Sequence, residues 1–426
     1  MNPSTSEPTL IIGAGLAGLV AALRLARAGR PVTVLEASQH LGGRARTLRA
    51  GDYHLNLGPH ALYRAGAARR ILQELQIPVD GAPAPLQGAV AWRGARDCAL
   101  PAGLLSLLTT DLLPAGAKLE VARVLAGLGR APAPTPGTTA AGWVAAQVRH
   151  PEARELLLAL VRLATYADAP ERLDAAAVVA QLARSTHGVL YLHRGWQPVA
   201  EALAAAVRAA GGQIRTRCRA ERLLGARRVE GVALADGATL PAASVVMAVP
   251  PRAASRLLEQ HAESPAHGWA TRLVPARASC LDVALPGPLP RPRRFFALGI
   301  DRADYASVHT SVADLGPGQV IHVARYLAPE AAPASRQALL QIMERLQPGA
   351  SEWALHMEYH PTMTVTHGVP LAAEHGRRPG PEVPGLEGAF VAGDWVGQEG
   401  MLADAACASG DQAAQTILHG AVEAAA

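Results

Sequence analysis

The sequence is poor in several features that would each point to a familiar class of protein. Aromatic residues make up only 4% of its 426 residues, and Lys118 is the only lysine. The net charge of +5 therefore comes almost wholly from arginines, which are scattered along the chain and not gathered in a stripe with interleaved aromatics. With so few aromatics to stack on bases, the composition argues against nucleic-acid binding.

Cysteines and long apolar runs are scarce as well. The chain contains no CxxC pair, and its cysteines lie far apart at Cys98, Cys218, Cys280 and Cys407. This spacing predicts neither a disulfide framework nor a zinc site. No apolar stretch reaches the roughly 18 to 20 residues that a membrane-spanning helix requires. The start, Met1 to Pro8, is short and polar, so we expect no signal peptide and a cytoplasmic location.

The most informative feature is a glycine-rich run near the start of the chain. The apolar stretch 9–12 ends at Gly13, and Gly15 and Gly18 complete a GxGxxG pattern. In this pattern the first glycine makes the tight turn, the second lets the backbone approach a pyrophosphate, and the third lets the next helix pack against its strand. That helix, expected from about Leu16 to Ala28, would direct free N–H groups and a partial positive charge at the phosphates.

A second strand and an acid complete the unit. The strand expected over 32–35 is followed by Glu36, which stands 18 residues after Gly18. A carboxylate at this spacing can accept hydrogen bonds from the ribose hydroxyls. Strand, glycines, helix, second strand and acid together predict that the chain binds a dinucleotide.

Two further motifs indicate that the dinucleotide is FAD. Gly42-Gly43-Arg44 places a guanidinium, which can grip a diphosphate in bidentate fashion, beside a glycine turn. Near the other end, a strand runs into Gly393-Asp394, and 401–410 opens a small-residue helix that continues to about Ile417. This set resembles the flavoprotein superfamily of amine oxidases, protoporphyrinogen oxidases and phytoene desaturases. The resemblance implies that Asp394 binds the flavin ribityl chain and that the 401–405 backbone faces the flavin pyrimidine edge.

A third matching stretch lies in the middle of the chain. The run 188–196 precedes a helix expected over 198–209, a strand begins at Gln213, and 244–251 is expected to be a buried strand. Ala220 falls where the superfamily has a residue whose backbone meets the adenine. The predicted cofactor-binding residues are Gly13, Ala14, Gly15, Leu16, Ala17, Gly18, Glu36, Ala37, Gly42, Gly43, Arg44, Gly58, Pro59, His60, Ala61, Ala220, Gly393, Asp394, Met401, Leu402 and Ala405.

The fold that this resemblance implies is α/β. It has a Rossmann-like FAD-binding domain, discontinuous in sequence over 1–81, 188–255 and 376–426, and an inserted mixed α+β substrate domain. The substrate domain would consist of a mainly helical part, 82–187, and a strand-rich part, 256–375. In the first part we expect a hairpin around 89–100, a proline-rich loop at 131–136, and helices over 104–113, 117–128, 142–149 and 152–166. In the second, alternation predicts strands over 320–324 and 353–357.

The candidate catalytic residues lie in 56–63, which resembles the segment that passes along the flavin ring. Amine oxidases usually carry Gly-Gly there, whereas phytoene desaturases and protoporphyrinogen oxidases often carry Gly-Pro, as Gly58-Pro59 does here. His60 would lie near the flavin and could transfer a proton near neutral pH. The alternative is a spacer whose ring bonds to the backbone and fixes the loop. Tyr63 is a candidate for the cavity wall, with plain packing as its alternative.

Other residues weigh on the type of reaction. Amine oxidases often use a lysine to hold a water beside flavin N5, but Lys118 falls in a predicted helix of the first insertion. They also often frame the flavin with an aromatic pair, yet 398–410 contains no aromatic residue, although Trp395 just upstream could substitute. Three histidines alternate within predicted strands with few acids nearby, so we expect no metal site at His356, His360 and His367.

These observations predict an FAD-dependent oxidoreductase that passes a hydride from a C–H bond of an apolar or amphipathic small molecule to flavin N5. The alternatives are a flavin amine or amino-acid oxidase that produces hydrogen peroxide, and a flavin-binding protein without turnover. The sequence leaves open the substrate, the electron acceptor and the oligomeric state. The leucines of 104–113 fit either a core face, which we favour, or a weak contact with a membrane surface at which the protein would be peripheral.

Overall fold

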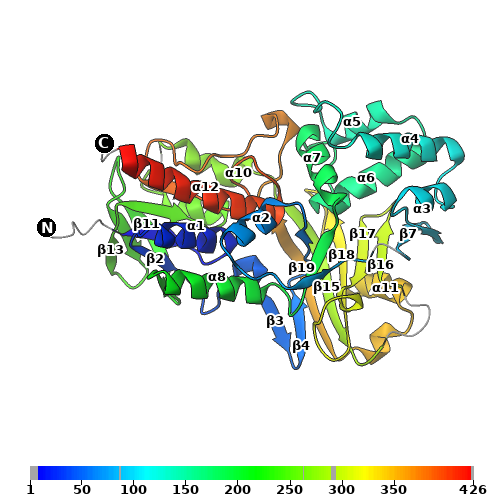
Figure 1. Cartoon of the computed structure of the whole chain (residues 1–426), viewed down its shortest axis with the longest axis horizontal. Helices are drawn as coiled ribbons and strands as arrows, with labels where there is room; N and C mark the ends of the chain where they lie inside the picture. Colours follow the sequence, from blue (N-terminus) through cyan, green and yellow to red (C-terminus); the bar gives the residue numbers. More distant parts are fainter. Residues whose placement is uncertain (1–7, 86–87, 262, 289–293, 424–426) are drawn as a thin grey trace.

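The computed structural model describes residues 8–85, 88–261, 263–288 and 294–423. Residues 1–7, which belong to the stretch that we expect not to be a signal peptide, lie outside this range. The two largest sheets lie toward opposite ends of the molecule, and the first and last helices, α1 and α12, run side by side (Figure 1). None of the described helices is long and apolar enough to cross a membrane.

A five-stranded parallel sheet forms the first of these two ends. Its order is β10-β2-β1-β14-β20, and every neighbouring pair is parallel. The strands are β10 (Gln213–Arg215), β2 (Val32–Leu35), β1 (Thr9–Ile12), β14 (Ser244–Met247) and β20 (Ala389–Val391). Segments that are far apart in sequence therefore build one sheet, with β1 at its centre.

Both faces of this sheet are covered, because alternate side chains of a strand point to opposite faces. Ile11 joins a core with four helices: α1 (Leu16–Arg27), α2 (Ala67–Glu74), α8 (Gln197–Ala209) and α12 (Leu402–Glu423). Leu10 and Ile12 join a second core, formed with β11 (Ala220–Leu224), β12 (Gly231–Leu234), β13 (Thr239–Pro241), α9 (Pro251–Leu257) and α10 (Trp269–Arg272). β1 is accordingly buried at every position, as expected for a central strand of a sheet covered on both faces.

A seven-stranded sheet of order β19-β15-β18-β17-β16-β7-β8 forms the other end. It is antiparallel except for the parallel pair β16–β7. Its strands are β7 (Val90–Arg93), β8 (Arg96–Ala99), β15 (Ala276–Leu285), β16 (Phe296–Gly299), β17 (Asp304–Val308), β18 (Gln319–Leu327) and β19 (His356–Thr366). Helix α11 (Arg336–Leu346) packs on one face through Leu339 and Met343, which leaves the other face toward the parallel sheet.

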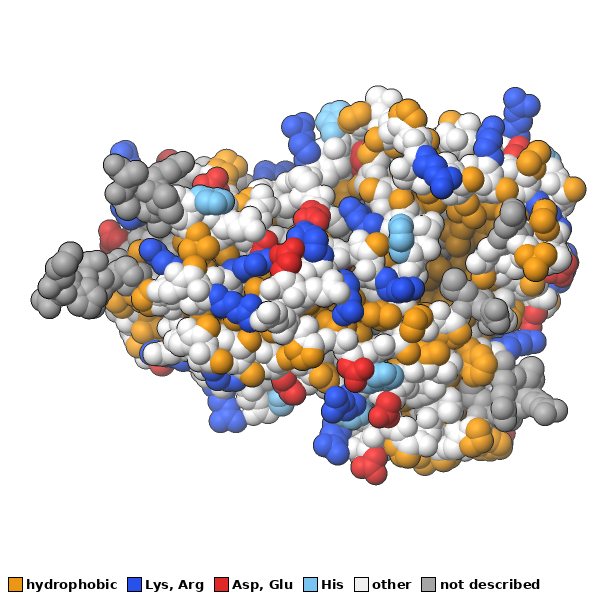
Figure 2. All heavy atoms as spheres, viewed as in Figure 1, with side chains coloured by type: hydrophobic (Ala, Val, Ile, Leu, Met, Phe, Trp, Pro, Cys, Tyr) orange, Lys and Arg blue, Asp and Glu red, His pale blue; other side chains and the backbone are white. Residues whose placement is uncertain are grey.

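Small sheets and a helical group connect the two ends. The sheets are β3–β4 (Thr47–Ala50, Tyr53–Asn56) and β5-β9-β6 (Leu62–Tyr63, Val189–Leu192, Gly81–Pro83). The helices are α3 (Leu104–Thr109), α4 (Ala115–Gly127), α5 (Ala140–Gln147), α6 (Pro151–Thr165) and α7 (Ala175–Ser185). On the face in Figure 2, hydrophobic side chains gather around a hollow beside these helices, and the Lys and Arg side chains are dispersed.

Several sequence predictions need correction. The helix expected over 104–113 ends at Thr109, because Thr110 is extended and its hydroxyl donates to the Ala99 carbonyl (2.6 Å) instead of continuing the helix. Within that stretch Leu107, Leu112 and Leu113 are buried, but Leu105 and Leu108 are exposed.

Two strand predictions were also imperfect. The strand expected over 353–357 begins only at His356, after a short 3-10 turn over Ala350–Trp353. The strand expected over 244–251 ends at Met247, and α9 starts at Pro251, where proline suits the first turn of a helix. The second insertion is not only strand-rich, since it also contains α10 and α11.

Candidate active site

A cavity of about 1080 Å³ lies between two walls. The nucleotide wall, as we call it, is formed by the turns that follow β1, β2, β14 and β20, together with the starts of α1, β11 and α12. The opposite sheet wall is formed by β15, β18, β19 and Tyr166 at the end of α6. Open parallel sheets bind their ligands at the carboxyl ends of the strands. The nucleotide wall is therefore the expected place for a dinucleotide.

The three motif glycines each avoid a Cβ for a different reason. Gly13 has φ +104°, and a Cβ there would overlap the Ala248 carbonyl. A Cβ on Gly18 would overlap the Gly13 carbonyl, so this glycine lets α1 lie close to its strand. A Cβ on Gly15 would meet nothing within 4 Å, because Gly15 faces the cavity at the start of α1. The protein thus leaves open space where the helix N-terminus can receive a phosphate.

Glu36 and the second glycine turn lie against this first turn. The Glu36 carboxylate accepts the N–H groups of Ala14 (2.9 Å) and Ser38 (2.8 Å) and lines the cavity. The Gly42 N–H donates to the Ala14 carbonyl (2.8 Å), which places Gly42-Gly43 directly beside Gly15. Gly42 has φ +101° and Gly43 φ +56°, conformations that favour glycine. The two motifs predicted for one dinucleotide are thus brought together.

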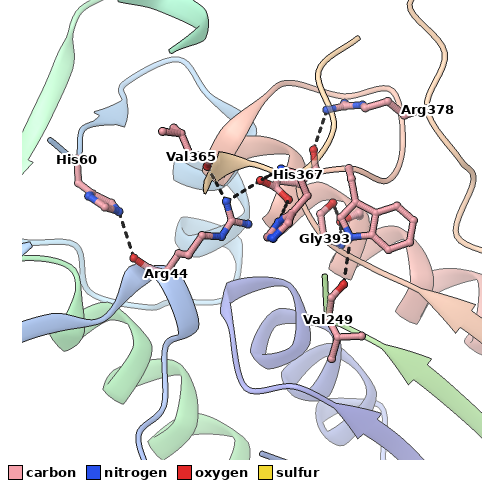
Figure 3. A network of polar contacts seen from close by, with 10 residues as sticks. Arg44, His60, Val249, Val365, His367, Arg378 and Gly393 are labelled. Carbon is pink, nitrogen blue, oxygen red and sulfur yellow. Dashed lines mark hydrogen bonds and ion pairs between the residues drawn. The ribbon is translucent and has the colours of Figure 1, made fainter. Parts of the chain in front are cut away.

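Arg44 and Asp394 form an ion pair at the wall (Figure 3). The Arg44 Nη1 lies 2.7 Å from Asp394 Oδ2 and 2.6 Å from the Val365 carbonyl. The His367 backbone N–H and ring Nδ1 also bond to the same carboxylate, at 3.1 and 3.2 Å. Burial alone raises the pKa of Asp394, but Arg44 and His367 outweigh it and hold the pKa well below its ordinary range. The carboxylate is therefore ionised and fixed in orientation.

Arg378 supports the turn that carries Asp394. Its guanidinium is buried and donates to the carbonyls of Asp394, Gly397 and Gly400, at 2.8–3.1 Å. Burial lowers the pKa of Arg378 to about 10, with Asp394 opposing that shift, so the group stays charged at neutral pH. Arg378 and His367 belong to no recognised motif, and the sequence analysis did not single out either as a partner of Asp394.

The segment 56–61, here called the cofactor loop, crosses between the walls. Its Pro59, His60 and Ala61 line the cavity. His60 Nδ1 lies 3.0 Å from the Gly58 carbonyl, and Nε2 lies 3.1 Å from the Arg44 carbonyl. Burial lowers the pKa of His60, although both carbonyls oppose that shift. Because both ring nitrogens contact the backbone, the geometry favours the spacer alternative over the proton-transfer one.

Tyr63, the second catalytic candidate, does not line the cavity. It is buried at the end of β5, and its hydroxyl donates to the Ala164 carbonyl (2.8 Å). Burial raises the pKa of this phenol above its ordinary value, so the group stays neutral. These contacts fit the packing alternative for Tyr63.

Most other predicted cofactor residues lie at the cavity surface. Those that line it are Gly13, Gly15, Leu16, Ala17, Glu36, Ala37, Gly42, Gly43, Arg44, Pro59, His60, Ala61, Ala220, Gly393, Asp394 and Leu402. Leu402 has φ +57° at the start of α12, a strained conformation that often marks a functional position. The residues that lie behind the surface are Ala14, Gly18, Gly58, Met401 and Ala405.

The sheet wall was not predicted at all. It presents Tyr166, Ala278, Cys280, Ala324, Tyr326, His360, Pro361, Thr362, Met363, Thr364 and Val365, none of which is Asp, Glu, Lys or Arg. Tyr326 is 2% exposed, and its hydroxyl has no hydrogen-bond partner among the described residues. Burial raises the pKa of Tyr326 and of Tyr166 well above the ordinary value, so both phenols are neutral donors. Within the described ranges no cluster of His, Cys, Asp or Glu could hold a metal ion.

The residues of the nucleotide wall fit FAD. An open cradle at Gly15, a helix N-terminus behind it and an arginine at the second glycine turn suit a pyrophosphate. The family described as flavin containing amine oxidoreductase matches residues 16–279. The chain belongs to this family. It is an FAD-dependent oxidoreductase, as the motifs predict.

The proteins to which this chain is similar differ in what they are named for. An L-amino-acid oxidase from Crotalus adamanteus is 52% identical over 73 residues, which are 17% of this chain and 14% of that protein. A protein provisionally named protoporphyrinogen oxidase from Exiguobacterium sp. 255-15 has a TM-score of 0.71 at 16% identity, over 97% and 98% of the two chains. A triple mutant of putrescine oxidase has a TM-score of 0.72 at 17% identity, over 97% and 99%. These two likenesses show the fold.

Proposed function

We propose that the enzyme dehydrogenates an apolar or amphipathic small molecule, with hydride passing from a substrate C–H bond to flavin N5. When bound, FAD would accept the hydride. The protein therefore needs only to bind the substrate, orient it and exclude water from it. The observation that carries this proposal is the sheet wall, where no carboxylate, lysine or arginine lines the cavity. An ammonium substrate would lose its hydration there without gaining a counter-ion.

The residues of the sheet wall suit such a substrate. Ala278, Ala324 and Met363 offer apolar surface, and the two neutral phenols of Tyr166 and Tyr326 meet edge to face with centroids 5.9 Å apart. The unpartnered Tyr326 hydroxyl can donate one hydrogen bond to a substrate oxygen or nitrogen. The substrate would then be held by apolar contact and oriented by a single polar one.

The position of the only lysine supports the same choice. Lys118 lies on α4, where its Nζ donates to the Leu108 carbonyl (2.8 Å), and it does not line the cavity. The lysine that many amine oxidases use beside flavin N5 therefore has no counterpart in this wall.

The second candidate is an amine or amino-acid oxidase that produces hydrogen peroxide. It is favoured by the 52% identity with an L-amino-acid oxidase, although that match covers only 14% of the relative. The putrescine oxidase fold likeness points the same way. Such a substrate would have to enter the cavity as the uncharged amine or find its counter-ion on the nucleotide wall.

Anaerobic mixing of the holoenzyme with different donors separates the candidates. The donors are a reduced porphyrinogen, a partly saturated polyene, putrescine and L-leucine, and the readout is the loss of flavin absorbance. We expect at least one of the first two to reduce the flavin while both amines leave it oxidised. Fast reduction by an amine, with stoichiometric hydrogen peroxide in air, would establish the second candidate instead. A flavin that no donor reduces would indicate a binding protein without turnover.

A further inference from the structure

One row of the seven-stranded sheet is polar where the rows beside it are apolar. Asp282, His322 and Ser307 lie opposite one another on β15, β18 and β17, and all three are fully buried. Two positions along, on the same face, Cys280 and Ala324 line the cavity. Because side chains two apart on a strand share a face, this row lies directly beside the cavity-lining residues of the sheet wall, on the same face.

Asp282 connects this row to the cofactor loop through a hydrogen bond. Asp282 Oδ1 lies 2.6 Å from His322 Nδ1, and Oδ2 accepts the Gly58 N–H at 2.8 Å. The Gly58 carbonyl lies 3.0 Å from the His60 ring, whose other nitrogen lies 3.1 Å from the Arg44 carbonyl. A continuous series of contacts therefore runs from the interior of the sheet through the loop to the nucleotide wall.

Stability alone is a weak explanation for this pair. A buried ion pair is often no more stable than two apolar side chains of similar volume, because both groups lose their hydration. His322 is held closely as well, since the His309 ring lies 4.2 Å away and stacks on Tyr191. Neither His309 Nε2 nor His322 Nε2 has a hydrogen-bond partner among the described residues, so the bond to Asp282 is the one directed contact of His322.

The Gly58 position shows how tightly the loop is held. Gly58 has φ +76°, and a Cβ there would lie 3.0 Å from Cys280 Sγ and 3.3 Å from Met363 Sδ. The loop is thus pressed against the sheet wall, and the N–H that points into the sheet finds a carboxylate as well as the Asn56 carbonyl (3.0 Å).

We propose that Asp282 and His322 are positioning residues for the cofactor. His322 fixes the orientation of the Asp282 carboxylate, which holds Gly58 and thereby sets Pro59 and His60 at the cavity surface. FAD then meets a preformed loop and does not have to order it on binding. This proposal depends on FAD as the cofactor and not on the substrate.

The test compares FAD affinity with stability. In Asp282→Ala the Gly58 N–H loses a charged acceptor, and we expect the Kd for FAD to rise about tenfold. In Asp282→Asn the amide oxygen can still accept that N–H, so the Kd should return to within about threefold of the wild type. Hydrogen exchange of the apo-protein should be faster over 56–61 in the alanine variant than in the asparagine variant.

A double variant separates positioning from stability. Asp282→Leu/His322→Leu removes both buried polar groups together, so we expect the apo-protein to keep its Tm while FAD still binds about tenfold more weakly. This variant decides the question if Asp282→Ala does not fold. Unchanged FAD affinity and unchanged exchange over 56–61, with only Tm altered, would overturn the proposal.

A matched control is an ion pair elsewhere in this sheet. Asp304 and Arg325 lie on β17 and β18 with N–O distances of 2.6 and 3.0 Å, and neither lines the cavity. Asp304→Leu/Arg325→Leu should leave FAD affinity unchanged. An equal loss of affinity in this control would mean that FAD binding responds to any change in the sheet, which would also overturn the proposal.

Discussion

The two walls of the cavity treat charge in opposite ways. On the nucleotide wall, the charges of Glu36, Arg44 and Asp394 each meet a partner, either a backbone group or an opposite charge. The sheet wall presents no Asp, Glu, Lys or Arg side chain, and Tyr326 has a hydroxyl with no partner among the described residues. The first wall suits a charged ligand that is the same at every turnover. The second would suit the neutral substrate of the proposed function.

The largest effect is expected at Gly15, where a substitution directly tests whether the nucleotide wall binds the charged ligand. Gly15 has φ −77°, which any residue adopts, and a Cβ there would meet no protein atom within 4 Å. Gly15→Val should therefore leave the Tm of the apo-protein nearly unchanged. Its side chain would occupy the phosphate cradle at a cost of about 3 kcal/mol, so FAD affinity should fall about 100-fold or more.

Titration of the apo-protein with FAD and thermal unfolding measure the two quantities. The matched control is Gly18→Val, where a side chain would overlap the Gly13 carbonyl and should lower Tm. If Gly15→Val bound FAD normally, the dinucleotide would not cross this turn.

Asp404 is an exception to the pairing of charges near the nucleotide wall. It is buried near the nucleotide wall, accepts the Ala68 N–H (2.9 Å), and its Oδ2 has no hydrogen-bond partner in the described part of the chain. Burial raises its pKa to about 6, and the Ala68 N–H opposes that shift only in part. The folded protein therefore holds the proton more tightly than the unfolded chain, and this stabilisation is lost as the pH rises from about 4 through about 6.

Asp404→Asn copies the protonated form and should keep the bond to Ala68. We expect the variant to be more stable than the wild type by about 2 kcal/mol at pH 7.5. The gain should shrink to less than half of that value at pH 4.5. Unfolding in denaturant at both pH values measures this difference. A gain that is equal at the two values would mean that Asp404 does not titrate in this range.

Substitution of His60 tests whether the cofactor loop takes part in proton transfer. With both ring nitrogens on backbone carbonyls, His60→Ala should loosen the loop and slow substrate-dependent flavin reduction by less than about tenfold. Burial lowers the pKa of His60, so the reduction rate should not change between pH 6.5 and 8 on its account. Rapid mixing measures the rate. A loss of 100-fold or more would return His60 to the proton-transfer role.

The smallest effects are expected at two buried tyrosines. Tyr63→Phe removes a bond to the Ala164 carbonyl and should cost about 1 kcal/mol of folding free energy. Tyr326→Phe removes a hydroxyl that has no partner within the described ranges, so it should leave stability equal or slightly higher. FAD affinity should stay unchanged in both. If Tyr326→Phe were as destabilising as Tyr63→Phe, its hydroxyl would have a partner of its own, such as a buried water.

The nucleotide wall could be predicted from sequence because its features are local. Gly13, Gly15 and Gly18 lie within six residues of one another. Their spacing predicts both the backbone conformation of the turn and the kind of ligand that it binds. Asp394 could be found because a strand and a Gly-Asp pair are adjacent. His367 and Arg378 could not, since each reaches this carboxylate or its turn by tertiary folding alone.

The sheet wall could not be predicted from the sequence, because its residues come together only through tertiary folding. Asp282 and His322 are 40 residues apart, and only the antiparallel register of β15 and β18 brings them together. Alternation predicts that a strand such as 320–324 has two faces, but not which face meets a cavity. Helices α2, α7 and α11 were not predicted either.

The packing of the last helix on the first has a consequence for synthesis. Gly410 of α12 lies so close to α1 that a Cβ would overlap the Ala17 carbonyl, and Ala413 and Ile417 belong to the same core as Leu19. The residues of α12 up to about Ile417 must therefore leave the ribosome before this core can close. Until then the part of α1 that α12 covers stays exposed, and transiently exposed apolar surface of this kind is prone to aggregation.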